Sequence, residues 1–181
     1  MEMIYETPRL LLRILQENAA DKVLEFYQEN KEIFERYEID RADNFYTKEY
    51  QAALLRMEYN LMVRMQAVRF WVFEKARPDR IIGTFSFHNI RYLAYQDCEL
   101  GYKFHQEVWG RGYARESIER GIAIMFEEMG LHRMEALVMP ENERSKCLLQ
   151  SLGFVREGVK RQNVRLRGIS VSYTHLTLPT I

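Results

Sequence analysis

The chain has 181 residues, of which 26 are Lys or Arg and 26 are Asp or Glu, so its formal net charge at pH 7 is zero. This length is enough for one domain with a substantial hydrophobic core. The balanced charge argues against a general nucleic-acid binder, because such proteins usually carry a basic excess.

Cysteine content and hydropathy bear on the cellular compartment. Cys98 and Cys147 lie far apart in the sequence without metal-ligand spacing, so we expect free thiols in a reducing cytoplasm. Neither end has the pattern of a signal peptide, and no apolar run is long enough to cross a bilayer. We therefore expect a cytoplasmic protein with no membrane partner.

The first half of the chain predicts two helices between strands. Residues 9–14 form a first strand, and helices are expected from Glu17 to Tyr37 and from Thr47 to Arg64. Strands follow at 68–75 and 81–89, and their short connections indicate antiparallel pairing. The apolar residues expected to form the buried stripe of the second helix are Tyr50, Leu54, Met57, Leu61 and Met65.

The second half contains a strand–helix–strand unit. Residues 95–105 alternate as a strand, 112–129 have helical spacing, and 132–139 form the next strand. Such a unit implies a parallel strand pair joined by a right-handed crossover. A short helix at 142–152 and two strands within 154–167 complete the pattern. The sum predicts an α+β (mixed α/β) fold, with a mixed central sheet and helices on both faces.

A glycine-rich turn separates the strand from the helix in this unit. Residues 109–114 read Trp-Gly-Arg-Gly-Tyr-Ala. The first N–H groups of a helix lack intrahelical partners and carry partial positive charge, and glycines let a phosphate approach the backbone closely. The turn is neither a dinucleotide fingerprint, since Arg115 stands at the third glycine position, nor a Walker A loop. It predicts a phosphorylated ligand, and a tight turn without a ligand is the alternative.

Further motifs follow the turn in a characteristic order. They are Leu-His-Arg-Met-Glu-Ala at 131–136, Met-Pro-Glu-Asn-Glu-Arg-Ser at 139–145, and Leu-Leu-Gln-Ser-Leu-Gly-Phe at 148–154. Together with the turn they resemble the GNAT acetyltransferases. The opening Glu-Thr-Pro-Arg-Leu-Leu-Leu-Arg at 6–13, the segment 153–158 and Trp109 are similar to the branch that acetylates the N-terminal alanine of ribosomal proteins. The resemblance implies a mostly antiparallel sheet with one splayed parallel strand pair.

The resemblance also implies acetyl-coenzyme A as the acetyl donor, with no metal. Its pyrophosphate would lie on the backbone N–H groups of Arg111 to Ala114. Its pantetheine arm would pair with the main chain of the strand before the turn, as a peptide does in β-augmentation. The donor-binding residues so implied are Tyr102, Phe104, Trp109, Gly110, Arg111, Gly112, Tyr113, Ala114, Asn142 and Ser145.

Two side chains are candidates for the chemistry of acetyl transfer. Glu99 is predicted as the general base, acting directly or through water, and a solvated strand carboxylate is the alternative. Many family members carry a tyrosine proton donor in the last helix, where this chain has Leu149. Ser145 or an ordered water is then the candidate that protonates the leaving thiolate, and a helix-start or packing serine is the alternative. One backbone N–H near Phe104 would hold the oxyanion.

The sequence leaves the acceptor of the acetyl group undecided among three possibilities. A protein N-terminal α-amine is the leading hypothesis, with a small amine such as a polyamine, amino acid or antibiotic as the second. A non-catalytic acyl-coenzyme A binding module is a third reading from a different class. We expect a monomer or homodimer and no direct contact with nucleic acid.

The last eleven residues, 171–181, differ from the rest in composition. They resemble the translated read-through of a transposase adapter used in making sequencing libraries, so residues 1–170 are predicted as the native acetyltransferase domain. The C-terminal strand of the fold is then expected to be missing, which would expose a sheet edge. The tail contains Val171, Tyr173 and Thr174, whose β-forming character would let it pair at that edge.

Overall fold

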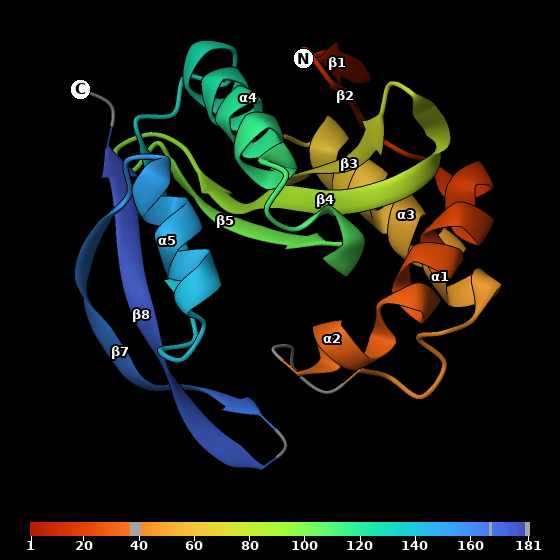
Figure 1. Cartoon of the computed structure of the whole chain (residues 1–181). Helices are drawn as coiled ribbons and strands as arrows, with labels where there is room; N and C mark the ends of the chain where they lie inside the picture. The colour runs from red at the N-terminus through yellow and green to blue at the C-terminus, as the bar shows by residue number, and fades with distance from the viewer. Residues whose placement is uncertain (37–40, 167, 180–181) are drawn as a thin grey trace.

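The computed structural model describes residues 1–36, 41–166 and 168–179. Eight strands form one sheet in the order β1-β2-β3-β4-β5-β6-β8-β7 (Figure 1). The strands are β1 (Ile4–Glu6), β2 (Leu10–Arg13), β3 (Val68–Glu74), β4 (Arg77–Arg91), β5 (Asp97–Phe104), β6 (Arg133–Val138), β7 (Val155–Leu166) and β8 (Ile169–Pro179). The helices are α1 (Ala20–Glu29), α2 (Lys31–Glu35), α3 (Lys48–Val63), α4 (Tyr113–Glu127) and α5 (Glu143–Ser151), with short 3-10 turns η1 (Glu17–Ala19) and η2 (Gln106–Val108).

The sheet is antiparallel except where β5 and β6 run parallel, joined by α4. These two strands pair only from Asp97 to Leu100 of β5, opposite Arg133 to Ala136 of β6. Residues 101–104 of β5 continue to pair with β4 on the other side. The two parallel strands therefore separate after Leu100, and the predicted mixed sheet with a splayed parallel pair is confirmed.

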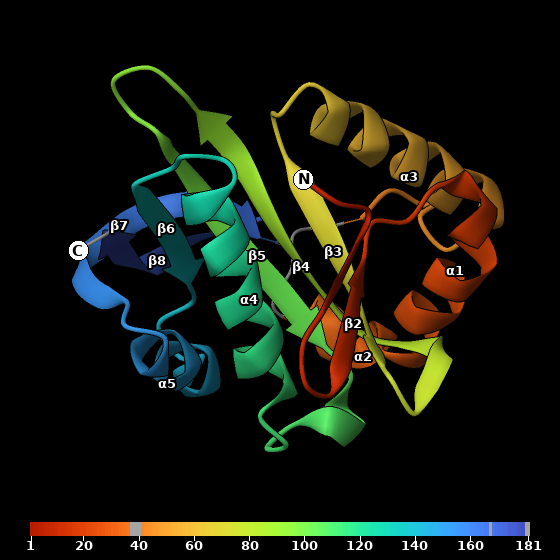
Figure 2. The ribbon, with the colours of Figure 1, turned by 90° about the horizontal axis from the view of Figure 1, so that it is seen from above.

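Helices cover both faces of the sheet, as the sequence predicts (Figure 2). On one face α4 buries Ile118, Ile124 and Met125 in a cluster that includes the rings of β4. Gly121 lets α4 approach closely, since a side chain there would collide with the ring of Phe85. On the other face α1, α2 and α3 pack around Trp71 in a second cluster. Burial of these apolar faces against one sheet supplies the main stabilisation of the domain.

The buried stripe of α3 differs from the prediction. Met57 and Met65 are 50% and 53% exposed, whereas Gln51 and Leu55 are buried. The amide of Gln51 donates a 2.6 Å hydrogen bond to the carbonyl of Phe45, which makes burial of this polar side chain possible. Apolar periodicity misplaced the stripe because it assigns a polar residue to the solvent face. Within the described residues no helix is long and apolar enough to cross a membrane.

The C-terminal region forms a longer hairpin than the sequence predicts. The expected pair of short strands is one strand, β7, which is antiparallel to β8. Strand β8 also pairs with β6, so it lies between β6 and β7. Residues 169–179 fill the position of the last strand, as expected of a tail with β-forming residues, and bury Thr174, Leu176 and Thr177. The absence of a native last strand stays a prediction. The predictions that reach Tyr37, Arg167 and the last two positions fall outside the described residues.

Candidate active site

The glycine turn leads from η2 into α4 and leaves open space at its surface. Gly110 and Gly112 have φ angles of 77° and 78°, in the left-handed region that favours glycine. Gly112 is the N-cap of α4 and accepts the first helical hydrogen bond from Glu116. A Cβ atom at Gly110 would meet nothing within 4 Å. The unpaired N–H groups of the first turn of α4 therefore follow a turn that is open at Gly110, whereas a Cβ atom at Gly112 would lie 3.4 Å from Nη2 of Arg9.

Arginines from distant segments gather at this turn. Arg9, before β2, donates 2.9 Å from Nη1 to the carbonyl of Arg111, and its Nε lies 2.6 Å from a carboxylate oxygen of Glu116. The guanidinium of Arg144 stacks over the Trp109 ring at 3.8 Å. The charge of Arg9 is paired with Glu116, whereas Arg111 and Arg144 add positive charge to the turn, which favours an anionic ligand. Sequence patterns missed Arg9 and Arg144, because nothing local links them to the turn.

A side-chain hydrogen bond ties the turn to the open end of β5. The indole Nε1 of Trp109 donates to the carbonyl of Phe104 at 3.1 Å. Phe104 is buried, and its ring fills the space beside Gly83 on β4. The structure thus brings together the turn and the stretch from Tyr102 to Phe104, where β5 has left β6. These sequence-predicted residues lie along the edge of β5 that no longer pairs with β6, and we use the word crevice for this splay between the two strands.

Glu99 lies at the last paired positions before the strands separate. Its side chain is 31% exposed, and it points away from the face in which Cys98 is buried. The amide Nδ2 of Asn89 donates to Glu99 Oε1 at 3.0 Å. Asn89 has a φ of 52° at a register shift between β4 and β5, an irregularity of the kind found beside active sites. The bulge is what aims Asn89 at the carboxylate.

The nearest basic group to Glu99 is His88. Its Nε2 lies 3.7 Å from Glu99 Oε2. Burial lowers the pKa of His88, although the carboxylate of Glu99 opposes this effect. The imidazole is therefore neutral at physiological pH, and its contact with Glu99 is not a permanent ion pair. Glu99 keeps an accessible carboxylate held by a neutral amide.

A second carboxylate, Glu135, lies beside Glu99 in the parallel register. Arg133 donates to Glu135 Oε1, and His175 Nε2 lies 2.9 Å from Oε2. Burial by itself would raise the pKa of Glu135, but these hydrogen bonds hold it at about 2. Glu135 therefore stays ionised as part of an ion-pair network, and it is a poor proton acceptor. Sequence patterns do not indicate this network, because His175 lies in β8, far from Glu135 along the chain.

The lowered pKa of Glu135 predicts an acid-sensitive contribution to stability. A carboxyl whose pKa is lower in the folded chain stabilises it above the unfolded value of 4.5 and loses that contribution as pH falls towards about 2. We expect Glu135→Gln to flatten this acid limb of the unfolding free energy. Urea unfolding of both proteins across that pH range measures it. An unchanged acid limb in the variant would contradict the assignment.

The start of α5 faces the crevice. Asn142 is the N-cap, and its Oδ1 accepts from the backbone N–H of Ser145 at 3.1 Å. The hydroxyl of Tyr102 donates to the carbonyl of Ser145 at 3.2 Å. Leu149 is 0% exposed in the core, whereas Cys147 is exposed. Asn142 and Ser145 thus lie at the helix start that Tyr102 of β5 contacts.

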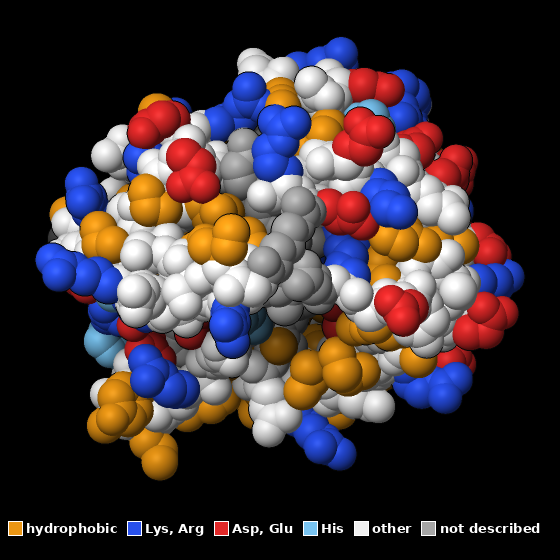
Figure 3. All heavy atoms as spheres, turned by 90° about the horizontal axis from the view of Figure 1, so that it is seen from below, with side chains coloured by type: hydrophobic (Ala, Val, Ile, Leu, Met, Phe, Trp, Pro, Cys, Tyr) orange, Lys and Arg blue, Asp and Glu red, His pale blue; other side chains and the backbone are white. Residues whose placement is uncertain are grey.

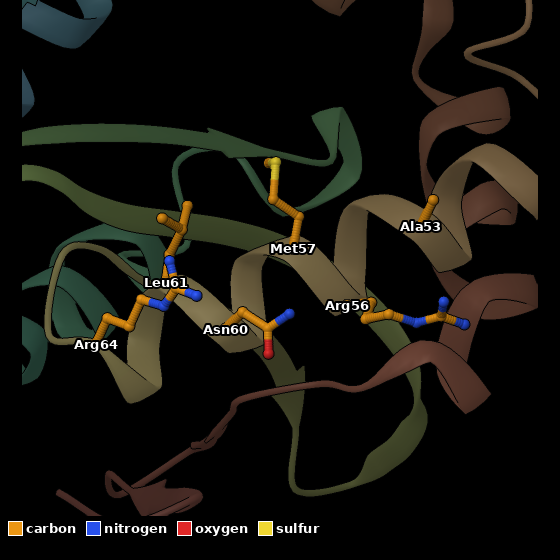
Figure 4. Close-up of a pocket in the computed structure, with 6 residues that line it drawn as sticks. All are labelled: Ala53, Arg56, Met57, Asn60, Leu61 and Arg64. Atoms are coloured by element: carbon orange, nitrogen blue, oxygen red, sulfur yellow. The ribbon is translucent and has the colours of Figure 1, made fainter.

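A separate hollow of about 440 Å³ lies along the solvent side of α3 (Figure 4). Its lining residues all belong to α3 and the residue after it, and they include none of the predicted site residues. They are Ala53, Arg56, Met57, Asn60, Leu61 and Arg64. We therefore place the candidate site at the crevice and not in this hollow. The described parts of the chain contain no group of three side chains arranged to hold a metal ion.

The chain matches a known protein family over most of its length. A family described as "Acetyltransferase (GNAT) domain" matches residues 9–155. The chain belongs to the GNAT acetyltransferases. The identification confirms the resemblance of the glycine turn and the later motifs, and it makes the protein an N-acetyltransferase.

Individual relatives of this GNAT enzyme cover nearly all of the chain. The probable N-acetyltransferase YjcK of Bacillus subtilis is 33% identical over 160 residues, 88% of each chain. The [ribosomal protein uS5]-alanine N-acetyltransferase of Escherichia coli is 29% identical over 162 residues, 90% of this chain and 83% of the relative. The solved ribosomal-protein-S5-alanine acetyltransferase of Vibrio fischeri superposes with a TM-score of 0.92 at 26% identity, over 99% of this chain and 97% of that one.

Proposed function

We propose that this enzyme transfers the acetyl group of acetyl-coenzyme A to the N-terminal α-amine of a protein, with a ribosomal-protein alanine as the leading acceptor. The observation that carries the proposal is Glu99, an accessible carboxylate held by Asn89 at the point where β5 and β6 separate. The full-length similarity to enzymes named for ribosomal-protein alanine supports the choice of acceptor.

The crevice fits the donor proposed for it. The backbone N–H groups at the start of α4, with Arg144 nearby, suit a pyrophosphate. The free edge of β5 from Tyr102 to Phe104 suits main-chain pairing with the pantetheine arm, the mode called β-augmentation. Asn142 and Ser145 at the start of α5 would border the thioester end. Each of these roles depends on backbone groups or charged side chains that are already in place in the folded chain.

Glu99 supplies the proton acceptor for the attacking amine. A protein α-amine has a reference pKa of about 7.7–8.0, against about 10.4 for lysine, so it needs little help to become neutral. As its nitrogen attacks the acetyl carbon, Glu99 takes the proton directly or through a water. A backbone N–H near Phe104 would stabilise the developing oxyanion. Because Glu99 points away from the face that holds α4, the acceptor would enter from the side of α1 and α2.

The face of the molecule on the side of α2 carries no single sign of charge. Figure 3 views the molecule from below, the side on which α2 and the far end of the β7–β8 hairpin lie in Figure 1. Lys and Arg side chains alternate there with Asp and Glu among hydrophobic patches (Figure 3). Strong electrostatic recruitment of a polycation or of nucleic acid needs a larger one-sign field. The mixed surface therefore favours a polypeptide terminus over a polyamine.

Direct competition between acceptors tests the proposal. We expect acetylation of a peptide that begins with alanine, located on its α-amine by mass spectrometry, to exceed acetylation of spermidine. The same peptide with a blocked N-terminus but a free lysine is the matched control and is expected to stay unmodified. Faster turnover of spermidine would favour a small-amine acetyltransferase. Binding of acetyl-coenzyme A without thiol release for any amine would favour a binding module.

A further inference from the structure

The side chain of Tyr102 bridges the crevice from β5 to α5. Its hydroxyl donates to the carbonyl oxygen of Ser145, 43 residues further along the chain, at 3.2 Å. Its ring packs against the core cluster that also contains Leu100 and Phe104, on the face covered by α4. Glu99 alternates with these residues and therefore faces the other way. Tyr102 and Glu99 thus flank the separated part of β5 from opposite sides of the sheet.

This position coincides with the start of the open crevice. Pairing of β5 with β6 ends at Leu100, two residues before Tyr102. The phenol therefore reaches from the free edge of β5 to the first turn of α5, where Ser145 lies. Under the proposed function, the thioester end of the donor would lie along this edge.

Two other side chains of α5 are candidates to donate a hydrogen bond to the leaving sulfur. Leu149, at the position where the family resemblance expects a tyrosine, is fully buried and has no polar atom. Ser145 contacts Asn142 and Tyr102 through its backbone N–H and carbonyl, so its hydroxyl is the competing donor that the experiment below must separate from Tyr102. Tyr102 is the phenol that lies at this place, and it belongs to strand β5 instead of helix α5.

The hydrogen bond of Tyr102 is suited to exchange its acceptor. Its 3.2 Å length exceeds the usual range for O–H···O contacts, so a charged acceptor nearby would compete well for the hydrogen. Burial raises the pKa of Tyr102 to about 12, although the contact with Ser145 opposes this. The phenol therefore keeps its hydrogen throughout the physiological pH range.

We propose that the Tyr102 hydroxyl, and not that of Ser145, donates the hydrogen bond that stabilises the leaving sulfur of coenzyme A; this inference rests on the proposed function. The amine nitrogen forms the new C–N bond, and the C–S bond breaks with its electron pair on sulfur. Glu99 accepts the amine proton and passes it to solvent. Tyr102 stays a neutral phenol while its O–H points at the thiolate, which then takes a proton from solvent.

Removing the hydroxyl tests the proposal through turnover. We expect Tyr102→Phe to lower kcat by about 10²-fold, comparable to the loss of one donor to a developing negative charge, while KM for acetyl-coenzyme A is unchanged. Phenylalanine keeps the ring packing, and thermal melting checks that the variant is folded. Tyr95→Phe is the matched control, because Tyr95 is an exposed tyrosine of the β4–β5 loop. Full kcat in Tyr102→Phe, or an equal loss in Tyr95→Phe, would overturn the proposal.

A second readout needs no acceptor. A hydrogen-bond donor beside the thiolate lowers the pKa of the bound coenzyme A thiol. We expect that pKa to be lower on the wild-type protein than on Tyr102→Phe, measured from the pH dependence of alkylation by iodoacetamide. Alkylated coenzyme A is quantified by mass spectrometry, so that the exposed Cys147 does not interfere.

The two readouts separate the possible failures. A thiol pKa that differs between the proteins, with no acetylation of any peptide, would support Tyr102 and reject the proposed acceptor. Acetylation of the peptide together with equal thiol pKa values would overturn the role of Tyr102, even if kcat falls, because a packing defect alone produces that pattern. A loss confined to Ser145→Ala would return the role to Ser145.

Discussion

Glu99→Gln is expected to lower kcat for a peptide α-amine by about 10²–10⁴-fold, the range typical of a lost general base. Glutamine has the same shape, and its Oε1 still accepts from Asn89, so the site keeps its geometry. It has no carboxylate to accept the amine proton. We expect the residual rate to keep rising with pH, as more of the free amine becomes neutral. Steady-state kinetics over the pH range in which the amine titrates measures both effects.

The control for this experiment is an exposed carboxylate elsewhere. Glu119 lies on the solvent side of α4, and Glu119→Gln is expected to keep the wild-type rate. Asn89→Ala should lie between the two, because it removes the amide that holds the base and leaves the base itself. Full turnover in Glu99→Gln would reject Glu99 as the base. A parallel loss of acetyl-coenzyme A affinity would indicate a structural role instead.

Leu176→Ala is expected to lower the free energy of unfolding by about 2–5 kcal/mol, the usual cost of truncating a buried leucine. Leu176 is 1% exposed, and it lies in β8 opposite Ala136 of β6 and Arg156 of β7. Its loss leaves a cavity in the core that these strands share with α4 and α5. Urea unfolding monitored by circular dichroism measures the change.

Deleting the chain after Gly168 extends this experiment to the whole strand. Without β8, strand β6 becomes an exposed edge and β7 loses its partner. We expect the truncated chain to show no cooperative melting transition of the C-terminal half. Ser170→Ala, at an exposed position of β8, is the matched control and should melt like the full chain. A truncated chain with an unchanged midpoint would show that residues 169–179 contribute little, as an incidental tail would.

The behaviour of β8 shows where sequence patterns reach their limit. The composition of residues 171–181 predicts a tail foreign to the domain, and we retain that origin as a proposal. The same residues alternate apolar and β-branched side chains, which suits any open edge of a sheet. Strand pairing depends on backbone groups that every sequence carries, so a strand position can be filled by a segment whose composition differs from the rest.

The order of elements and the glycine turn follow from the sequence alone. The turn is defined by local features: glycines at positions of positive φ, a strand before them and a helical period after them. Such features can be recognised in a single sequence. The same holds for the motif at Asn142, whose capping role depends on a residue three positions on. Glu99 could also be identified as a candidate from the sequence, because alternation along one strand places it on the face opposite Cys98.

Only the tertiary structure decided what surrounds those residues. Arg9 and Arg144 reach the glycine turn, Asn89 reaches Glu99, and Tyr102 reaches Ser145 across separations of 10 to more than 100 residues. Such contacts leave no periodic trace in the sequence, since each depends on the sheet order and on the point where β5 leaves β6. The sequence by itself therefore determined the family and the glycine turn. The contacts of Glu99 with Asn89, and of Tyr102 with Ser145, were decided by how the strands are placed.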